Sequence, residues 1–169
     1  MNMSPHFTLK ELTTTTNNGV DNSPDEESLV FLAKLATHYL EQIRRQFGPL
    51  RITSGYRSRA LNSVIHMASR DSAHSYGCAA DVQSINGSDV YEMVRWVVME
   101  SGLDYDQVID EERGGGRWMH IGILRPRHEP SPRREALVMR NGVYSRFSVV
   151  LREPKNGDLK SPQQKEKLP

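Results

Sequence analysis

Residues 72–81, SAHSYGCAAD, and residues 118–123, WMHIGI, combine the apolar positions of strands with histidine and aspartate. Successive side chains of a strand point to opposite faces, so His120 faces away from the core that Met119 and Ile121 enter. Asp81 lies between two apolar residues and is expected to face the same side of a sheet as His120. The two stretches therefore predict neighbouring strands with a polar site on one face.

His74, Asp81 and His120 form a plausible catalytic zinc set. Zinc accepts imidazole nitrogen and carboxylate oxygen, and a catalytic site keeps its fourth position for water or substrate. The spacing alone is weak, because it is not an HExxH helix, and the alternative interpretation is three polar residues satisfied by hydrogen bonds. A further alternative is a metal-free structural protein whose histidines have no special role.

Helical patterns come first in the chain and strand patterns concentrate later. Ser23 is the expected N-cap of a helix that ends at Phe47, and Ser88 is the expected N-cap of a second helix that ends before Gly102. Strands are expected near residues 50–52, 79–83, 105–111 and 117–124, and Asn141-Gly142 predicts a hairpin that joins residues 136–140 to 143–147. This order predicts an α+β fold with a mainly antiparallel sheet packed with helices.

Length and composition exclude several classes of protein. The 169 residues are 37% hydrophobic, enough for one core, and no apolar run is long enough to span a membrane. A single cysteine, Cys78, excludes an internal disulfide. We expect one domain over residues 1–152, followed by a disordered tail over 153–169 that is almost devoid of apolar residues.

Charge is divided unevenly along the chain. The net charge is +1, but residues 1–116 hold 10 Lys+Arg and 16 Asp+Glu, and residues 117–169 hold 12 and 5. The overall balance predicts no nucleic-acid partner, and the basic segment is expected to be a solvated face or a surface that meets anionic polymers. No signal peptide is apparent, so we expect synthesis in the cytoplasm, and we expect a monomer.

Several motifs occur together in a recognisable order. Residues 7–12 read FTLKEL, residues 52–58 read ITSGYRS, and the two histidine-containing stretches follow. Over about residues 7–147 the chain resembles the zinc D-Ala-D-Ala carboxypeptidases, a family that includes peptidoglycan peptidases and phage endolysins and shares its fold with hedgehog signalling domains. The resemblance implies zinc ligands at His74, Asp81 and His120. It also implies an active-site role for Arg57, as a donor to a substrate carboxylate or an oxyanion, and for Ser72 in substrate binding.

The family also uses an acidic residue shortly before its last histidine as the catalytic base. Glu111 fits best, with Asp110 and Glu112 as alternatives, because the register of the strand is open and residues 112–117 are rich in glycine. Trp118 is expected to form a wall for the substrate or to pack as a core aromatic. His66 is expected to be exposed, with an extra site residue as the alternative, and Cys78 is expected to pack inward instead of binding the metal.

The resulting prediction is a zinc-dependent peptidase, of the D,D-carboxypeptidase or L-alanyl-D-glutamate endopeptidase type, that cuts peptide bonds of the peptidoglycan stem peptide or cross-link. The absence of a signal favours a phage-type lysin that reaches the bacterial cell wall, in the periplasm or from a virion, and a cytoplasmic peptidase of peptidoglycan recycling also fits. The alternative is a non-enzymatic zinc-binding recognition module of the same fold.

Overall fold

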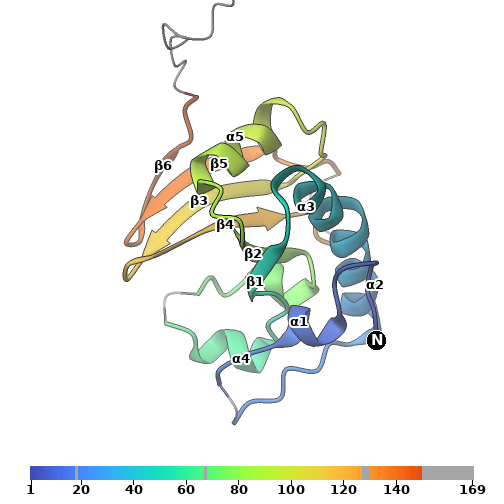
Figure 1. Cartoon of the computed structure of the whole chain (residues 1–169). Helices are drawn as coiled ribbons and strands as arrows, with labels where there is room; N and C mark the ends of the chain where they lie inside the picture. Colours follow the sequence, from blue (N-terminus) through green and yellow to red (C-terminus); the bar gives the residue numbers. More distant parts are fainter. Residues whose placement is uncertain (18, 67, 127–129, 150–169) are drawn as a thin grey trace, which may run out of the picture.

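Six strands form one sheet across the molecule. The computed structural model describes residues 1–17, 19–66, 68–126 and 130–149, and the expected tail over 153–169 lies outside them. The strands are β1 (Leu50–Ser54), β2 (Ala79–Ser84), β3 (Gln107–Arg113), β4 (Gly116–Gly122), β5 (Glu135–Arg140) and β6 (Val143–Arg146). Their order is β1-β2-β4-β3-β5-β6, and every neighbouring pair is antiparallel except β3 and β5. The predicted mixture of helices with a mainly antiparallel sheet is confirmed (Figure 1).

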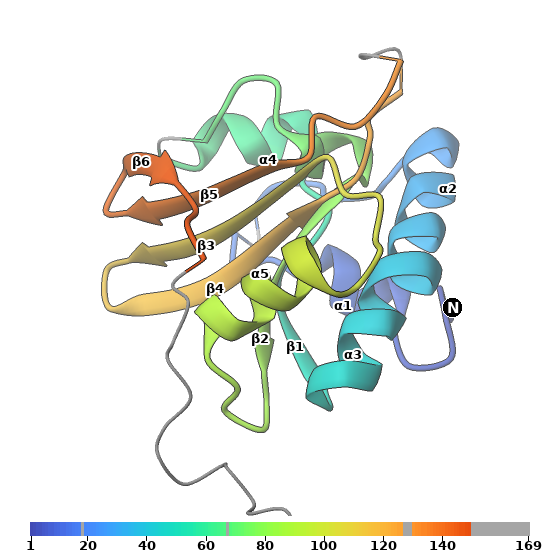
Figure 2. The ribbon, with the colours of Figure 1, turned by 90° about the horizontal axis from the view of Figure 1, so that it is seen from above.

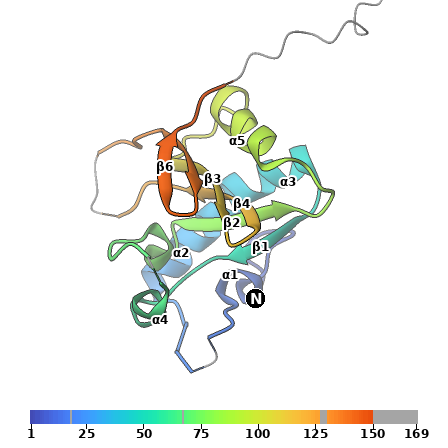
Figure 3. The ribbon, with the colours of Figure 1, turned by 90° about the vertical axis from the view of Figure 1, so that its left-hand side faces the viewer.

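Helices lie on both sides of this sheet. They are α1 (Leu9–Thr13), α2 (Glu26–Leu35), a π-helical segment (Ala36–Leu40), α3 (Glu41–Phe47), α4 (Arg59–Val64), a 3-10 helix (Ala73–Tyr76) and α5 (Val90–Met99). Figures 2 and 3 show α5 on one side of the sheet and α4 on the other. Within the described ranges, no helix combines the length and the apolar character that crossing a bilayer requires.

The core occupies the side of the sheet on which α5 packs. Met119, Ile121 and Ile123 are fully buried there, as their alternation predicts, and they join Val82 and the apolar faces of α2, α3 and α5. Burying this apolar surface stabilises the fold by removing it from water. The opposite face of β2, β3 and β4 carries Asp81, Glu111 and His120.

The hairpin prediction is confirmed in detail. Asn141 and Gly142 have φ angles of 48° and 91° and connect β5 to β6. Two consecutive positive φ angles define the type I′ turn, whose twist matches that of the flanking strands.

Both predicted helix caps are wrong by one or two residues. Asp25, not Ser23, accepts a hydrogen bond from the Ser28 backbone N–H at 2.8 Å, so Pro24 precedes the cap. Asp89, not Ser88, caps α5, since the Ser88 hydroxyl interacts with Ser84 instead. In each case a nearby aspartate supplies a charged acceptor, which suits the positive end of the helix better than a hydroxyl does.

Candidate metal centre

The sheet register brings Asp81 and His120 together. Asp81 in β2 lies directly opposite His120 in β4, and His120 lies opposite Ile109 in β3. Residues directly opposite in neighbouring strands share a face, so Asp81 and His120 project away from the core. Both are nonetheless buried, because segments outside the sheet cover this face.

His74 approaches the same point from the 3-10 helix before β2. Its Nδ1 lies 2.7 Å from the carbonyl oxygen of Gly55, which accepts hydrogen bonds only. Nδ1 therefore carries the proton, and Nε2 presents a lone pair to Asp81. Gly77 then turns the chain into β2 with φ 71°, where a Cβ atom would collide with the carbonyl oxygen of Ser28. Glycine is the residue that this turn accepts without strain.

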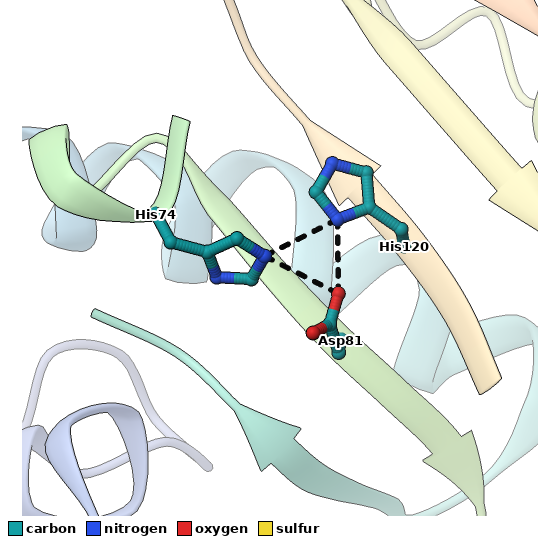
Figure 4. Close-up of side chains that lie close together, drawn as sticks. All are labelled: His74, Asp81 and His120. Atoms are coloured by element: carbon teal, nitrogen blue, oxygen red, sulfur yellow. Dashed lines mark hydrogen bonds and ion pairs between the residues drawn. The ribbon is translucent and has the colours of Figure 1, made fainter. Parts of the chain in front are cut away.

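Three potential ligand atoms converge in this arrangement. His120 Nδ1 lies 2.9 Å from Asp81 Oδ1, and His74 Nε2 lies 3.3 Å from both of these atoms (Figure 4). Burial lowers the pKa of His74, which favours its neutral, metal-binding form. Burial alone would raise the pKa of Asp81, but the hydrogen bond from His120 at 2.9 Å holds it well below its ordinary value. An anionic oxygen and a lone pair that face each other in a buried site fit a cation between them.

Hydrogen bonds from Arg57 support the cluster. Its Nη2 donates to Asp81 Oδ2 at 2.8 Å, and its Nε donates to Ser54 Oγ at 2.8 Å. These bonds orient the carboxylate so that Oδ1 faces the histidines, which is how residues behind a metal ligand position it. The second terminal nitrogen of Arg57 has no hydrogen-bond partner among the described residues, and Arg57 lines the adjoining cleft.

The structure separates the three candidate acids on β3. Glu111 lines the cleft, where its Oε2 accepts a hydrogen bond from Trp118 Nε1 at 2.6 Å. Burial, followed by the negative charge of Asp81, raises the pKa of Glu111. Asp110 lies on the opposite face, fully buried between the guanidinium groups of Arg117 and Arg140, which outweigh burial and lower its pKa.

Glu112 does not line the cleft, and its one ion pair within the described ranges is a long one of 3.5 Å with Arg140. Of the three acids, Glu111 alone shares the cleft with the histidines. The register that the sequence left open follows from the β3–β4 pairing, in which Glu111 lies opposite Trp118.

The cleft beside the cluster has a volume of about 570 Å³. The predicted substrate residues Ser72 and Trp118 both line it, and so does His66, which is exposed as expected. Cys78 packs inward as predicted: it is fully buried, and burial raises the pKa of its thiol to about 12. It is not a member of the ligand cluster.

Among the cleft-lining residues that sequence reasoning missed are Arg113 and Tyr144. The alternation of β3 would have placed Arg113 with Glu111 once the register was known. Tyr144 lies on β6, and no local pattern connects it with the histidines.

A comparison with models of protein families matches residues 5–109 to the model described as Peptidase M15. This match spans more than half of the chain. The chain belongs to the peptidase M15 family. The family comprises zinc D-Ala-D-Ala carboxypeptidases and endolysins, so the predicted recognition is confirmed. A search among curated proteins found no match.

The M15 match includes Arg57, His74 and Asp81 but ends before Glu111 and His120. The sheet register joins those last two residues to the matched segment. Membership supports a zinc metallopeptidase, and the His74–Asp81–His120 cluster is suited to hold the metal.

Proposed function

We propose that this M15 peptidase hydrolyses peptide bonds of the peptidoglycan stem peptide or cross-link with zinc held by His74, Asp81 and His120. The observation that carries the proposal is the convergence of three buried ligand atoms beside a cleft that also contains Glu111. His74 Nε2 and Asp81 Oδ1 are both acceptors, and a cation could bind both of them together with His120 Nδ1.

Zinc bound there would supply Lewis acidity and lower the pKa of water toward neutrality. Glu111 is the proposed general base, which takes a proton from the attacking water and returns it to the leaving amine. Its raised pKa suits this role, because a carboxylate of ordinary acidity is a poorer proton acceptor and donor near neutral pH.

Arg57 is proposed to stabilise negative charge on the substrate. Its second terminal nitrogen is free to donate while its other nitrogens hold Asp81 and Ser54. A guanidinium already fixed by two hydrogen bonds loses little freedom when it binds an oxyanion or a carboxylate. Ser72 and Trp118 are proposed to contact the substrate from the walls of the cleft.

The test measures zinc content and release of free amines from purified peptidoglycan by the same protein samples. We expect about one zinc per chain and amine release by the wild type, with both lost in His120→Ala. His38→Ala is the matched control, because His38 is exposed on the π-helical segment. Zinc without amine release would instead favour the non-enzymatic recognition module of the same fold.

The proposal extends to a phage-type lysin that acts as a monomer at the bacterial cell wall. The basic segment 117–169 supports contact with an anionic envelope. Clearing of a suspension of permeabilised bacteria, with the mass of the released peptides, tests this role and identifies the bond that is cut.

A further inference from the structure

Four arginines line the cleft beside the candidate metal centre, and they differ in their partners. Arg57 is paired with Asp81, Arg125 with Asp71, and Arg133 with Asp106. Arg113 is the fourth. It has neither an ion pair nor a hydrogen bond with its side chain in the part of the chain that the structure describes, although it is half-buried.

The position of Arg113 relative to Glu111 follows from the geometry of β3. Ile109, Glu111 and Arg113 alternate onto the cleft face, so Arg113 lies about 7 Å further along the strand than Glu111. The cleft thus continues past the proposed base as far as Arg113.

Tyr144 reaches the cleft from the β5–β6 hairpin, level with Glu111 in the sheet. Tyr144 lies opposite Met139, and Met139 lies opposite Glu111, so Tyr144 and Glu111 share one face of the sheet. Tyr144 is 55% exposed. Partial burial, followed by the charge of Glu111, raises the pKa of its phenol, which is protonated at neutral pH in any case. A protonated phenol can donate a hydrogen bond to an anion.

Glu111 forms no ion pair with Arg113 among the described residues. The Glu111 Oε2 atom is engaged by Trp118 Nε1, and the charge of Arg113 acts on Glu111 only from beyond ion-pair distance. A guanidinium that is partly withdrawn from water without a hydrogen-bonded anion is costly, and an anionic group entering the cleft would offset that cost. Its planar fork is well matched to a carboxylate, which it can bind through two parallel hydrogen bonds.

We propose that Arg113, with Tyr144 beside it, binds a carboxylate of the peptide substrate within one or two residues of the scissile bond. The inference rests on the proposed peptidase function and adds a specificity determinant to it. The separation of Arg113 from Glu111 along β3 matches this position, because two residues of an extended peptide span about 7 Å. Both residues lie beyond the segment that matches the M15 model, so this subsite would be a feature of the C-terminal part of the sheet.

The test uses soluble stem peptides from peptidoglycan in two forms: native, and with carboxylates converted to carboxamides by carbodiimide and ammonium. We expect the wild type to prefer the native form in kcat/KM by about ten- to a hundredfold, the range of a charged hydrogen bond. Arg113→Gln should bring this ratio close to one, and Arg113→Lys should restore part of it. Tyr144→Phe should lower it by a smaller factor. Arg45→Gln removes an exposed charge outside the cleft and should keep the wild-type ratio.

If Arg113→Gln keeps the wild-type preference in kcat/KM for the native peptide, the subsite is refuted and the proposed function is unaffected. A wild type that cuts neither form would contradict the proposed function. In that case, the subsite is tested by measuring the binding of the same two peptides to zinc-loaded protein by calorimetry. A preference for the native form that is lost in Arg113→Gln supports it, and equal binding or no binding overturns it.

Discussion

Replacing each of the three consecutive acids of β3 by its amide should produce three different outcomes. Asp110, Glu111 and Glu112 are adjacent in the sequence and chemically similar, but their environments differ. Asp110 is buried between two arginines, Glu111 lines the cleft, and the side chain of Glu112 is 45% exposed. The substitutions Asp110→Asn, Glu111→Gln and Glu112→Gln remove a charge with little change in shape.

Asp110→Asn should destabilise the fold. Arg117 and Arg140 donate four hydrogen bonds to this carboxylate at 2.6–3.1 Å. Breaking a fully buried ion pair costs about 3–5 kcal/mol. The two arginine side chains are 32% and 38% exposed and can be hydrated in the variant, which reduces the expected loss to about 2–3 kcal/mol. For a domain of this size, that corresponds to a fall in Tm of roughly 4–12 °C.

Glu111→Gln should instead lower activity without lowering stability. The raised pKa of Glu111 means that folding disfavours its ionised form, so a neutral amide leaves the free energy of unfolding at pH 7 unchanged or higher. The glutamine oxygen can still accept from Trp118. Loss of the general base should lower kcat by about 10²–10⁴-fold. Glu112→Gln should change stability by less than about 1 kcal/mol and leave kcat near that of the wild type.

Thermal unfolding followed by circular dichroism, and amine release from peptidoglycan at equal zinc occupancy, give the two measurements for each variant. Full activity in Glu111→Gln would refute the assignment of the base. Loss of activity in Asp110→Asn at unchanged Tm would show that the two faces of β3 have been assigned the wrong way round.

Three further outcomes follow from the structure. Removal of the metal with a chelator should abolish amine release and lower Tm, and added Zn²⁺ should restore both, because binding to the folded state alone stabilises it. Arg133 outweighs burial and lowers the pKa of Asp106, so the stability that ionised Asp106 contributes at neutral pH is lost as the pH falls below about 4. Tm should therefore fall between pH 5 and pH 3, and less steeply in Asp106→Asn. Gly55→Ala would place a Cβ atom against the carbonyl oxygen of Leu12 and should cost about 1–3 kcal/mol, together with weaker zinc binding through His74. Gly19→Ala, in open space, is its control.

Local patterns in the sequence predicted much of this protein correctly. The two-residue alternation around His120 and Asp81 separates core from cleft within each strand, and Asn141-Gly142 specifies a tight turn by its backbone preference alone. These features depend on residues that are close along the chain. The helix caps failed because Ser23 and Ser88 each compete with a nearby aspartate, and composition does not decide which of them binds the free N–H groups.

Contacts between segments that are distant in the sequence decided the features of the site that local patterns did not predict. The choice of Glu111 over its two neighbours depends on the β3–β4 register, which a hairpin with Gly114 and Gly115 leaves undetermined in sequence. Tyr144 joins the cleft only because β5 pairs in parallel with β3 and carries β6 with it. Alternation is a property of one strand, whereas register and strand order depend on the free energy of packing the whole sheet. The sequence alone therefore determined which residues are chemically suited to the site, and the tertiary structure determined which of them meet.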